Sequence, residues 1–288
     1  MQPLFIDLHT HTSASDGSDS PADLVRKAAE ARLAAIAITD HDTISGVEEA
    51  QEAGRALGVE VIPGCELSVS SEYGEVHILG LWLPHRSDTL KARLAELRQR
   101  RDERNEHILE RLAALGMPLT MEEVKAFSSG EALGRPHIAR AMAARGYAPD
   151  LQTAMSQYLA TGKPAYVPKA PFTPEEGVAL LLEFGATVSL AHIMLLRCPE
   201  DWRADMVARL ARCGMDAIEA YHSEFSARDE RTCIGFANQH GLAITGGSDY
   251  HGTSKPHIRI GRGKGGLRVT CAILDRLKAH RRSLGLPV

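Results

Sequence analysis

The chain has 288 residues, about twice the length of a typical domain, so it holds either two domains or one barrel-sized domain with an insertion. Hydrophobic residues make up 44% and charged residues 24%, with a net charge of −4, which argues against a disordered chain, and no apolar run approaches the roughly 18 residues of a membrane span. Five scattered cysteines without a C-x-x-C pair argue against a disulfide framework, so we expect a cytoplasmic protein with no membrane partner.

Short apolar runs alternate with amphipathic segments over most of the chain. The apolar runs predict strands at residues 4–8, 34–39, 59–62, 76–83, 187–191, 217–221 and 242–245. Helices are predicted at residues 21–32, 44–57, 174–183, 201–212 and 227–240. Ser20 is the expected N-cap of the first helix, with Pro21 in its first turn. Alternating strands and helices predict a parallel sheet with crossover helices, and seven strands favour a closed or nearly closed β/α barrel.

The alternation breaks between residues 84 and 171. This segment is almost wholly helical in pattern, and we expect its helices at residues 88–115, 121–127, 136–145 and 150–159. We therefore predict a barrel built from residues 1–84 and 171–288, with a helical insertion at residues 85–170 that lies over one end of the barrel.

Three polar side chains occupy alternate positions at the end of the first predicted strand. Alternation along a strand places Asp7, His9 and His11 on one face, which we expect to point into the barrel. Two imidazoles on one face can hold a cation, and Asp7 is expected to orient one of the rings from behind.

Further groups that bind metals stand at or near the ends of the other predicted strands. They are His41, Glu66, His77, His192, His222, Asp249 and His251. His77 alone would more often be a core histidine, because apolar residues flank it, but all these positions agree with the catalytic end of a β/α barrel. Nitrogen and oxygen ligands without thiolates suit Mn²⁺, Zn²⁺ or Fe²⁺. Their number exceeds the needs of one ion, so two or three ions and phosphoryl chemistry are expected.

As a set, four blocks resemble the motifs of the PHP (polymerase and histidinol phosphatase) family of metal hydrolases. The blocks are Asp7-Leu8-His9-Thr10-His11, Thr39-Asp40-His41-Asp42, Ala191-His192 and Ser248-Asp249-Tyr250-His251. The resemblance runs from the first strand to about residue 252, interrupted by the insertion. It implies a distorted seven-stranded β/α barrel with a centre of three divalent ions, of which Mn²⁺ is the first expectation.

The resemblance also implies a ligand set, position by position. It places His9, His11, Glu66 and Asp249 on the first ion. Glu66 would bridge to a second ion held by His77 and His192, and the third ion would be held by Asp16, His41 and His251. Asp249 is also expected to help handle the proton of the attacking water.

The first helix of the insertion carries cations within its apolar stripe. Helical spacing places Arg101, with Arg104 or Asn105, in the middle of a stripe of leucines and isoleucine. Buried guanidinium groups need an anionic partner. That partner is either a second anionic group of the substrate or an acidic residue of the same helix, and the sequence leaves both open.

Other residues extend the candidate substrate site. Arg135 and His137 stand at the start of a predicted helix, where free N–H groups favour an anion, although a surface turn would explain them too. Lys169, like Lys163, is a weaker candidate for the same role, and Asp16 is counted with the substrate contacts as well as with the metal ligands. His222 is expected to contact the phosphate or to protonate the leaving oxygen.

Together these features most resemble single-chain PHP phosphoesterases that remove the 3′-phosphate of nucleoside 3′,5′-bisphosphates in nucleotide metabolism. The expected partner is a small phosphorylated nucleotide, bound through its 5′-phosphate by the cations of the insertion. The alternatives are a 5′-to-3′ exoribonuclease acting on short RNA, a histidinol-phosphate phosphatase and a non-catalytic metal-binding module. Residues 252–288 hold nine Lys or Arg and one acidic residue, which fits either an RNA-binding tail or a solvated helix.

Overall fold

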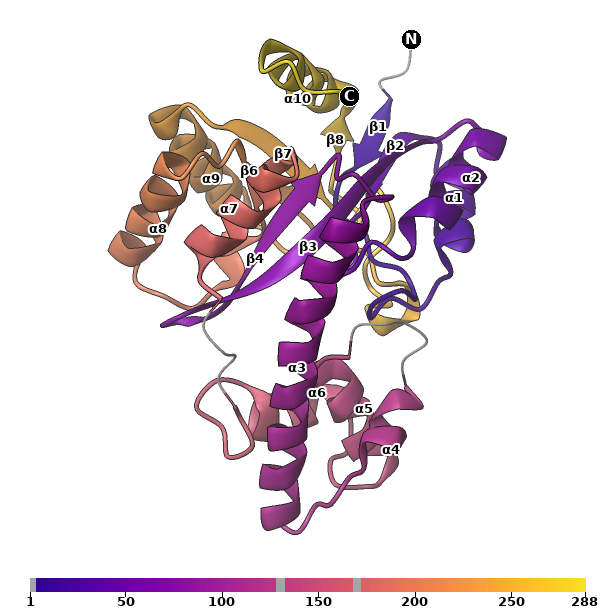
Figure 1. Ribbon diagram of the computed structural model, residues 1–288, viewed down its shortest axis with the longest axis vertical. Helices are drawn as coiled ribbons and strands as arrows, with labels where there is room; N and C mark the ends of the chain where they lie inside the picture. Colours follow the sequence, from indigo (N-terminus) through magenta and orange to yellow (C-terminus); the bar gives the residue numbers. More distant parts are fainter. Residues whose placement is uncertain (1–3, 128–132, 168–171) are drawn as a thin grey trace.

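The structure of the protein is a computed structural model that describes residues 4–127, 133–167 and 172–288, and of Arg100 and Arg101 it describes the backbone alone (Figure 1). The described strands form one sheet in the order β7-β6-β5-β4-β3-β2-β1-β8. They are β1 (Phe5–Asp7), β2 (Leu33–Ile38), β3 (Glu60–Ser71), β4 (Gly74–Leu81), β5 (Thr187–Leu190), β6 (Ala217–His222), β7 (Ala243–Gly247) and β8 (Val269–Thr270).

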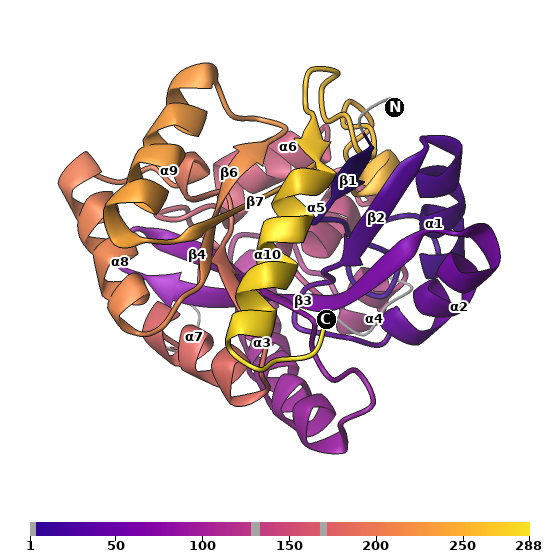
Figure 2. The same cartoon turned by 90° about the horizontal axis from the view of Figure 1, so that it is seen from above.

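Helices surround this sheet, with α1 and α2 on one side and α7, α8 and α9 on the other (Figure 2). The barrel helices are α1 (Pro21–Glu30), α2 (Val47–Leu57), α7 (Pro174–Glu183), α8 (Glu200–Arg212), α9 (Ala227–His240) and α10 (Cys271–Ser283), with short 3-10 turns η2 (Ile193–Leu195) and η3 (Gly252–Ser254). As predicted, Ser20 caps α1, because its hydroxyl accepts a hydrogen bond from the Asp23 amide. No helix in the described ranges is long and apolar enough to cross a bilayer.

The sheet curves until its first and last major strands meet. The Leu8 amide donates to the Gly246 carbonyl over 3.1 Å, and Thr10 and Tyr250 form a parallel bridge just beyond. These bonds join β7 to the segment that follows β1. The seven strands from β1 through β7 therefore form the nearly closed barrel that the sequence predicts. The two residues of β8 add an antiparallel edge to β1 that is too short to show as a sequence pattern.

The expectation of an all-parallel sheet is wrong at β4. This strand runs antiparallel to both β3 and β5, because a two-residue turn at Glu72 and Tyr73 reverses the chain where a parallel neighbour would need a crossover helix. His77 therefore lies near the start of β4, not its carboxyl end. Reversal of the strand still leaves His77 at the same end of the barrel as the other ligands.

The insertion lies beyond the opposite end of the barrel from α10 (Figure 1). Its helices match the predicted segments and are α3 (Asp88–Ala114), α4 (Met121–Lys125), α5 (Arg135–Ala144), α6 (Leu151–Ala154) and the π-helix η1 (Met155–Leu159). α3 connects two cores: Leu90 and Leu94 pack in the barrel core, while Ile108 and Leu112 pack in a separate core of the insertion. The middle of α3 therefore lies at the junction, beside the open end of the barrel.

Candidate active site

All nine side chains expected to bind metal lie together at the end of the barrel that faces the insertion. His9, His11 and Asp16 come from the loop after β1, and His41 follows β2. Glu66 and His77 lie within the β3–β4 hairpin. The loop after β5 carries His192, and the loop after β7 carries Asp249 and His251.

Glu66 is the centre of this cluster. Its carboxylate is 1% exposed and lies among five imidazole rings. Oε1 lies 3.3 Å from His9 Nε2, 3.1 Å from His77 Nδ1 and 3.0 Å from His192 Nε2. Oε2 lies 3.2 Å from both His11 Nε2 and His41 Nδ1. A carboxylate whose two oxygens face different histidines has the geometry of a bridging ligand.

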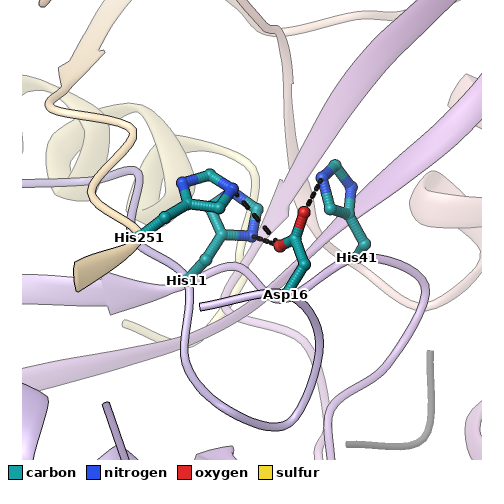
Figure 3. Close-up of side chains that lie close together, drawn as sticks. All are labelled: His11, Asp16, His41 and His251. Atoms are coloured by element: carbon teal, nitrogen blue, oxygen red, sulfur yellow. Dashed lines mark ion pairs between the residues drawn. The ribbon is translucent and has the colours of Figure 1, made fainter. Parts of the chain in front are cut away.

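Asp16 organises a second part of the cluster, with its carboxylate between His41 on one side and His11 and His251 on the other (Figure 3). One ligand atom from each of these four residues lies within 4.8 Å of all the others. The same spacing holds for three more sets, which are His9-Glu66-His192, His9-His11-Asp249 and His41-Glu66-His77. The sets overlap through shared residues, as expected of a centre that holds more than one ion.

The donor atoms fit divalent metals. Nε2 of His9 and both ring nitrogens of His11 are buried and make no hydrogen bond to any described residue. Carboxylate oxygens nevertheless surround them at 3.2 to 3.8 Å. Buried imidazole nitrogens without partners are costly unless something else satisfies them, and a cation between nitrogen and oxygen donors would do so. Nitrogen and oxygen donors without sulfur suit Mn²⁺, Zn²⁺ or Fe²⁺.

The charges of the cluster also favour a cation. Burial alone would lower the pKa of His11 and His77, but the carboxylates beside them outweigh it and raise these pKa values to about 9 and about 10. Burial prevails at His41, whose pKa falls to about 3. Despite its burial, Glu66 has a pKa well below the usual range, because His77, His9 and His41 lie beside it. A field that raises the proton affinity of imidazoles attracts a divalent cation for the same reason.

The residue that orients His9 is Glu219, not Asp7 as we expected. Glu219 Oε1 lies 3.0 Å from His9 Nδ1, and Oε2 accepts the His192 amide hydrogen at 2.8 Å. Glu219 is fully buried on β6 and so links two ligands that come from different loops. The sequence shows a carboxylate in this strand, but its partners come close only when β6 pairs with β5 and the barrel closes between β7 and the chain after β1.

Asp7 instead ties together the loops at the barrel seam. Its carboxylate accepts hydrogen bonds from the amide and the hydroxyl of Ser248 at 2.7 and 2.5 Å and from the Gly261 amide at 2.7 Å. Burial raises the pKa of Asp7 in spite of these hydrogen bonds. Asp7 therefore stabilises the backbone next to Asp249 without touching a histidine ring.

Two of the ligands lie on backbone that only a few residue types adopt readily. His192 has φ +22° and Asp249 has φ +54°. Glu219 accepts from the amide of His192, and the His9 carbonyl accepts from the amide of Asp249 at 2.9 Å. Left-handed backbone at non-glycine residues is found most often at functional sites, where the surrounding structure holds it in place.

A cavity of about 330 Å³, the metal cavity, opens onto the cluster. Lys255 lines it, and its Nζ lies 2.6 Å from Oδ2 of Asp249. Burial alone would lower the pKa of Lys255, but the Asp249 carboxylate outweighs it and the pKa is raised. Lys255 is not among the predicted site residues, because in the sequence it is one of nine basic residues of the C-terminal segment and no motif distinguishes it.

A second cavity of about 300 Å³, the arginine cavity, shares the wall of His41, Asp16 and His77 with the first. Arg104, Arg135 and His137 line it, as the sequence predicts for substrate contacts. The anionic partner of both guanidinium groups is Glu75 of β4, at 3.4 Å from Arg104 Nη1 and 3.1 Å from Arg135 Nη2. Since Glu75 Oε1 also lies 3.3 Å from His77 Nε2, one carboxylate connects the arginines to a metal ligand.

The structure does not bring every predicted substrate residue into these cavities. Asn105 is buried and lines neither cavity, and its amide nitrogen donates to the Leu133 carbonyl at 3.2 Å. His222 lies behind Asp249, with Nε2 3.6 Å from Oδ2, and its Nδ1 accepts the Glu224 amide hydrogen. The side chain of Arg101 and the whole of Lys169 lie outside the described residues.

Comparison with known proteins identifies the family of this chain. The model of the PHP domain family matches residues 7–154, a range that includes the first six candidate ligands. This chain belongs to the PHP domain family.

Similarity to individual proteins extends over nearly the whole chain. The chain is 34% identical to the 5′-3′ exoribonuclease Rnm of Escherichia coli, over 90% of this chain and 89% of that protein. It is 30% identical to a 3′,5′-nucleoside bisphosphate phosphatase of Chromobacterium violaceum, over 85% of this chain and 87% of that one. Its fold matches an amidohydrolase structure from Chromobacterium violaceum with a TM-score of 0.85 and 28% identity, covering 96% and 97% of the two chains.

Proposed function

We propose that this PHP protein is a metal-dependent phosphomonoesterase that hydrolyses the 3′-phosphate of nucleoside 3′,5′-bisphosphates and leaves a 5′-nucleotide. The observation that carries the proposal is the adjacency of the two cavities. One contains the ligand cluster and the other contains Arg104 and Arg135, and both are lined by His41 and His77. A substrate with two phosphates separated by one sugar fits such a pair of sites.

Three divalent ions, with Mn²⁺ as the first candidate, would be held by the nine ligands in the assignment that family resemblance implies. Bound there, such ions neutralise phosphoryl oxygens and supply activated water. Asp249 is placed to take a proton at Oδ2, where Lys255 donates to it and His222 Nε2 faces it. Lys255 Nζ also adds a positive charge to the wall of the metal cavity, where it would attract the substrate phosphate.

Recognition of the second phosphate is assigned to Arg135 and Arg104, supported by His137 at the start of α5. Glu75 holds both guanidinium groups in place, and these three side chains together carry one net positive charge. An arriving phosphate would meet oriented N–H donors, which is the arrangement that favours charge-assisted binding.

A 5′-3′ exoribonuclease is the second candidate, and a specific observation favours it, since the relative Rnm carries that name at 34% identity. Its chemistry would use the same metal centre, and the arginine cavity would hold the 5′-phosphate of an RNA. A histidinol-phosphate phosphatase is less well supported, because its substrate has one phosphate and would leave the arginine cavity without a role.

A product-release assay on a small panel tests the proposal. Inorganic phosphate is measured for the two small phosphomonoesters and free nucleoside 5′-monophosphate for the oligoribonucleotide, because an exoribonuclease cleaves phosphodiester bonds and releases no inorganic phosphate. The panel contains adenosine 3′,5′-bisphosphate, a 5′-phosphorylated oligoribonucleotide and histidinol phosphate, each with the Mn²⁺-loaded protein. We expect the bisphosphate to have the highest kcat/KM. A higher value for the oligoribonucleotide would favour the exoribonuclease, and no release from any of the three would refute a phosphoesterase.

The second-phosphate assignment has its own test. Arg135→Ala should raise the KM for adenosine 3′,5′-bisphosphate about tenfold or more, because it removes charge-assisted hydrogen bonds. Arg145→Ala is the matched control, since Arg145 caps the other end of α5 and forms an exposed ion pair with Glu123. Equal KM values for the two variants would contradict the assignment.

A further inference from the structure

The arginine cavity has an apolar side that the two phosphates do not explain. Tyr73, Leu196 and Met155 line it together with the charged groups, and we refer to these three residues as the apolar wall. Tyr73 is 38% exposed, among the more exposed large hydrophobic residues of the described chain. Leu196 lines the metal cavity as well, so the apolar wall extends alongside both candidate phosphate positions.

Contacts from several elements hold the apolar wall in place. The Tyr73 ring packs edge-on against Trp202 of α8, with 4.9 Å between the ring centroids. The hairpin turn beneath it is fixed by the Ser71 hydroxyl, which donates to the Gly74 carbonyl at 2.8 Å. Gly74 has φ +131°, and a methyl group there would lie 3.5 Å from Leu196 Cδ1. The β3–β4 turn and Leu196 therefore form one continuous surface.

The insertion contributes one residue of the apolar wall, and that residue lies in a π-helix. Met155 opens the π-helix η1, and π-helical turns are rare and often found at functional sites. The same turn contacts the cationic side of the cavity, because Arg135 Nη1 donates to the Leu159 carbonyl at 3.4 Å. The π-helix η1 thus supplies a methionine to the lining of the cavity and a carbonyl that holds one of its arginines.

We propose that the apolar wall binds the nucleobase of the substrate, chiefly by stacking on Tyr73. This inference rests on the proposed function, in which the metal cluster and the arginines take the two phosphates. The remaining part of a nucleoside bisphosphate is a flat aromatic ring, and an exposed aromatic side chain held rigidly beside the phosphate sites is a surface on which such a ring stacks.

The chemistry of the apolar wall also sets its selectivity. Hydroxyl groups at or beside the apolar wall are those of Tyr73 and of Thr161, whose Oγ1 would lie 3.7 Å from a methyl group on Gly74. Stacking tolerates any base, because every base has a π face. The protein should therefore require a base without strongly preferring one, and adenosine and uridine substrates should differ in KM by less than about tenfold.

The test compares adenosine 3′,5′-bisphosphate with the base-free analogue 1-deoxyribose 3,5-bisphosphate. For the unaltered protein, the KM of the base-free compound should be about tenfold higher. Tyr73→Ala should reduce this ratio of KM values to near one, while kcat for the nucleotide changes little. Tyr73→Phe, which keeps the ring, should retain the ratio. Leu196→Ala is a second variant that leaves the hairpin turn intact and should lower the ratio in the same direction.

Each outcome separates this inference from the proposed function. If the unaltered protein releases no phosphate from the bisphosphate, both are wrong. If it turns the bisphosphate over but Tyr73→Ala and Leu196→Ala keep the original ratio, the proposed function stands and the base site is wrong. A ratio that falls in Tyr73→Phe as far as in Tyr73→Ala would overturn the stacking role, since it would assign the effect to the hydroxyl.

Discussion

Individual side chains fix the orientation of the candidate metal ligands. Glu219 accepts from His9 Nδ1 and from the His192 amide, so it fixes a ring on one loop and the strained backbone of another. Carboxylates behind histidine ligands set the ring orientation and raise the affinity of the site for metal. Glu219 is therefore a positioning residue that lines neither cavity.

Glu219→Gln should lower Mn²⁺ affinity about 10- to 100-fold, because a glutamine has one acceptor oxygen for two donors. Isothermal titration calorimetry on the metal-free protein measures the change. Glu183→Gln, an exposed change at the end of α7, is the control and should bind Mn²⁺ like the unaltered protein. Equal affinity of the two variants would contradict the role of Glu219.

Most of the candidate ligands could be grouped from the sequence, because strand-end residues of a β/α barrel lie at one face. Asp16 lies in the loop well beyond β1 and enters the set only through the family resemblance. Glu75, Glu219 and Lys255 could not be predicted, because their importance depends on partners that are distant in the chain.

The role of Asp7 also depends on partners that are distant in the chain. Strand alternation groups Asp7 with His9 and His11, but the amides that it accepts from belong to residues 248 and 261.

At the scale of elements, the seam between β1 and β7 brings the first and last ligand loops together. Gly247 ends β7 directly beside His9, and a methyl group there would lie 2.3 Å from His9 Cβ and 2.5 Å from His9 N. The lack of a side chain at Gly247 therefore permits the approach that joins β7 to the chain after β1.

Gly247→Ala should destabilise the protein by about 1–3 kcal/mol, because the added methyl group overlaps backbone that must shift. The shift should also displace His9 and reduce the bound metal, measured by elemental analysis after dialysis. Gly235→Ala is the matched control within α9, where a methyl group meets nothing within 4 Å. It should raise the free energy of unfolding by about 0.5–1 kcal/mol, and a similar change in both variants would count against the seam.

Element types were predictable, whereas the direction of β4 was not. Both strands of the β3–β4 hairpin are apolar enough to predict strands, and periodicity carries no information about direction. The signal for the direction of β4 is the short interval between the two predicted strands. No helical segment separates residues 62 and 76, so a crossover helix cannot connect them. The hairpin matters for function because it carries Glu66, His77, Glu75 and Tyr73, and so supplies parts of both cavities.

At the scale of the whole molecule, the barrel and the insertion have separate cores, and both supply residues that line the arginine cavity. α3 reaches from one core to the other, and its buried Arg104 lies where they meet. The basic helix α10 lies at the opposite end of the barrel (Figure 1). Its positive charges are therefore far from the metal cluster, and Lys255 is the cation of the C-terminal segment that reaches it.

Metal binding should stabilise the whole barrel, because the candidate ligands come from the loops after four of its strands and from the β3–β4 hairpin. At a Mn²⁺ concentration about 100-fold above the Kd, one site contributes about 2.7 kcal/mol, which for a chain of this size corresponds to a rise in Tm of about 5–10 °C. Differential scanning fluorimetry after chelator treatment measures it. Mg²⁺ at the same concentration is the control and should have little effect, since it prefers oxygen ligands. An equal rise with Mg²⁺ would contradict a site dominated by imidazole.

We propose that the cluster of candidate metal ligands and the arginine cavity act together on the 3′-phosphate of a nucleoside 3′,5′-bisphosphate. Chromatographic identification of the nucleotide formed from adenosine 3′,5′-bisphosphate by the Mn²⁺-loaded protein tests it most directly. The account predicts adenosine 5′-monophosphate and one equivalent of phosphate, with neither formed by His192→Ala. Adenosine 3′-monophosphate as the product, or unchanged substrate, would contradict it.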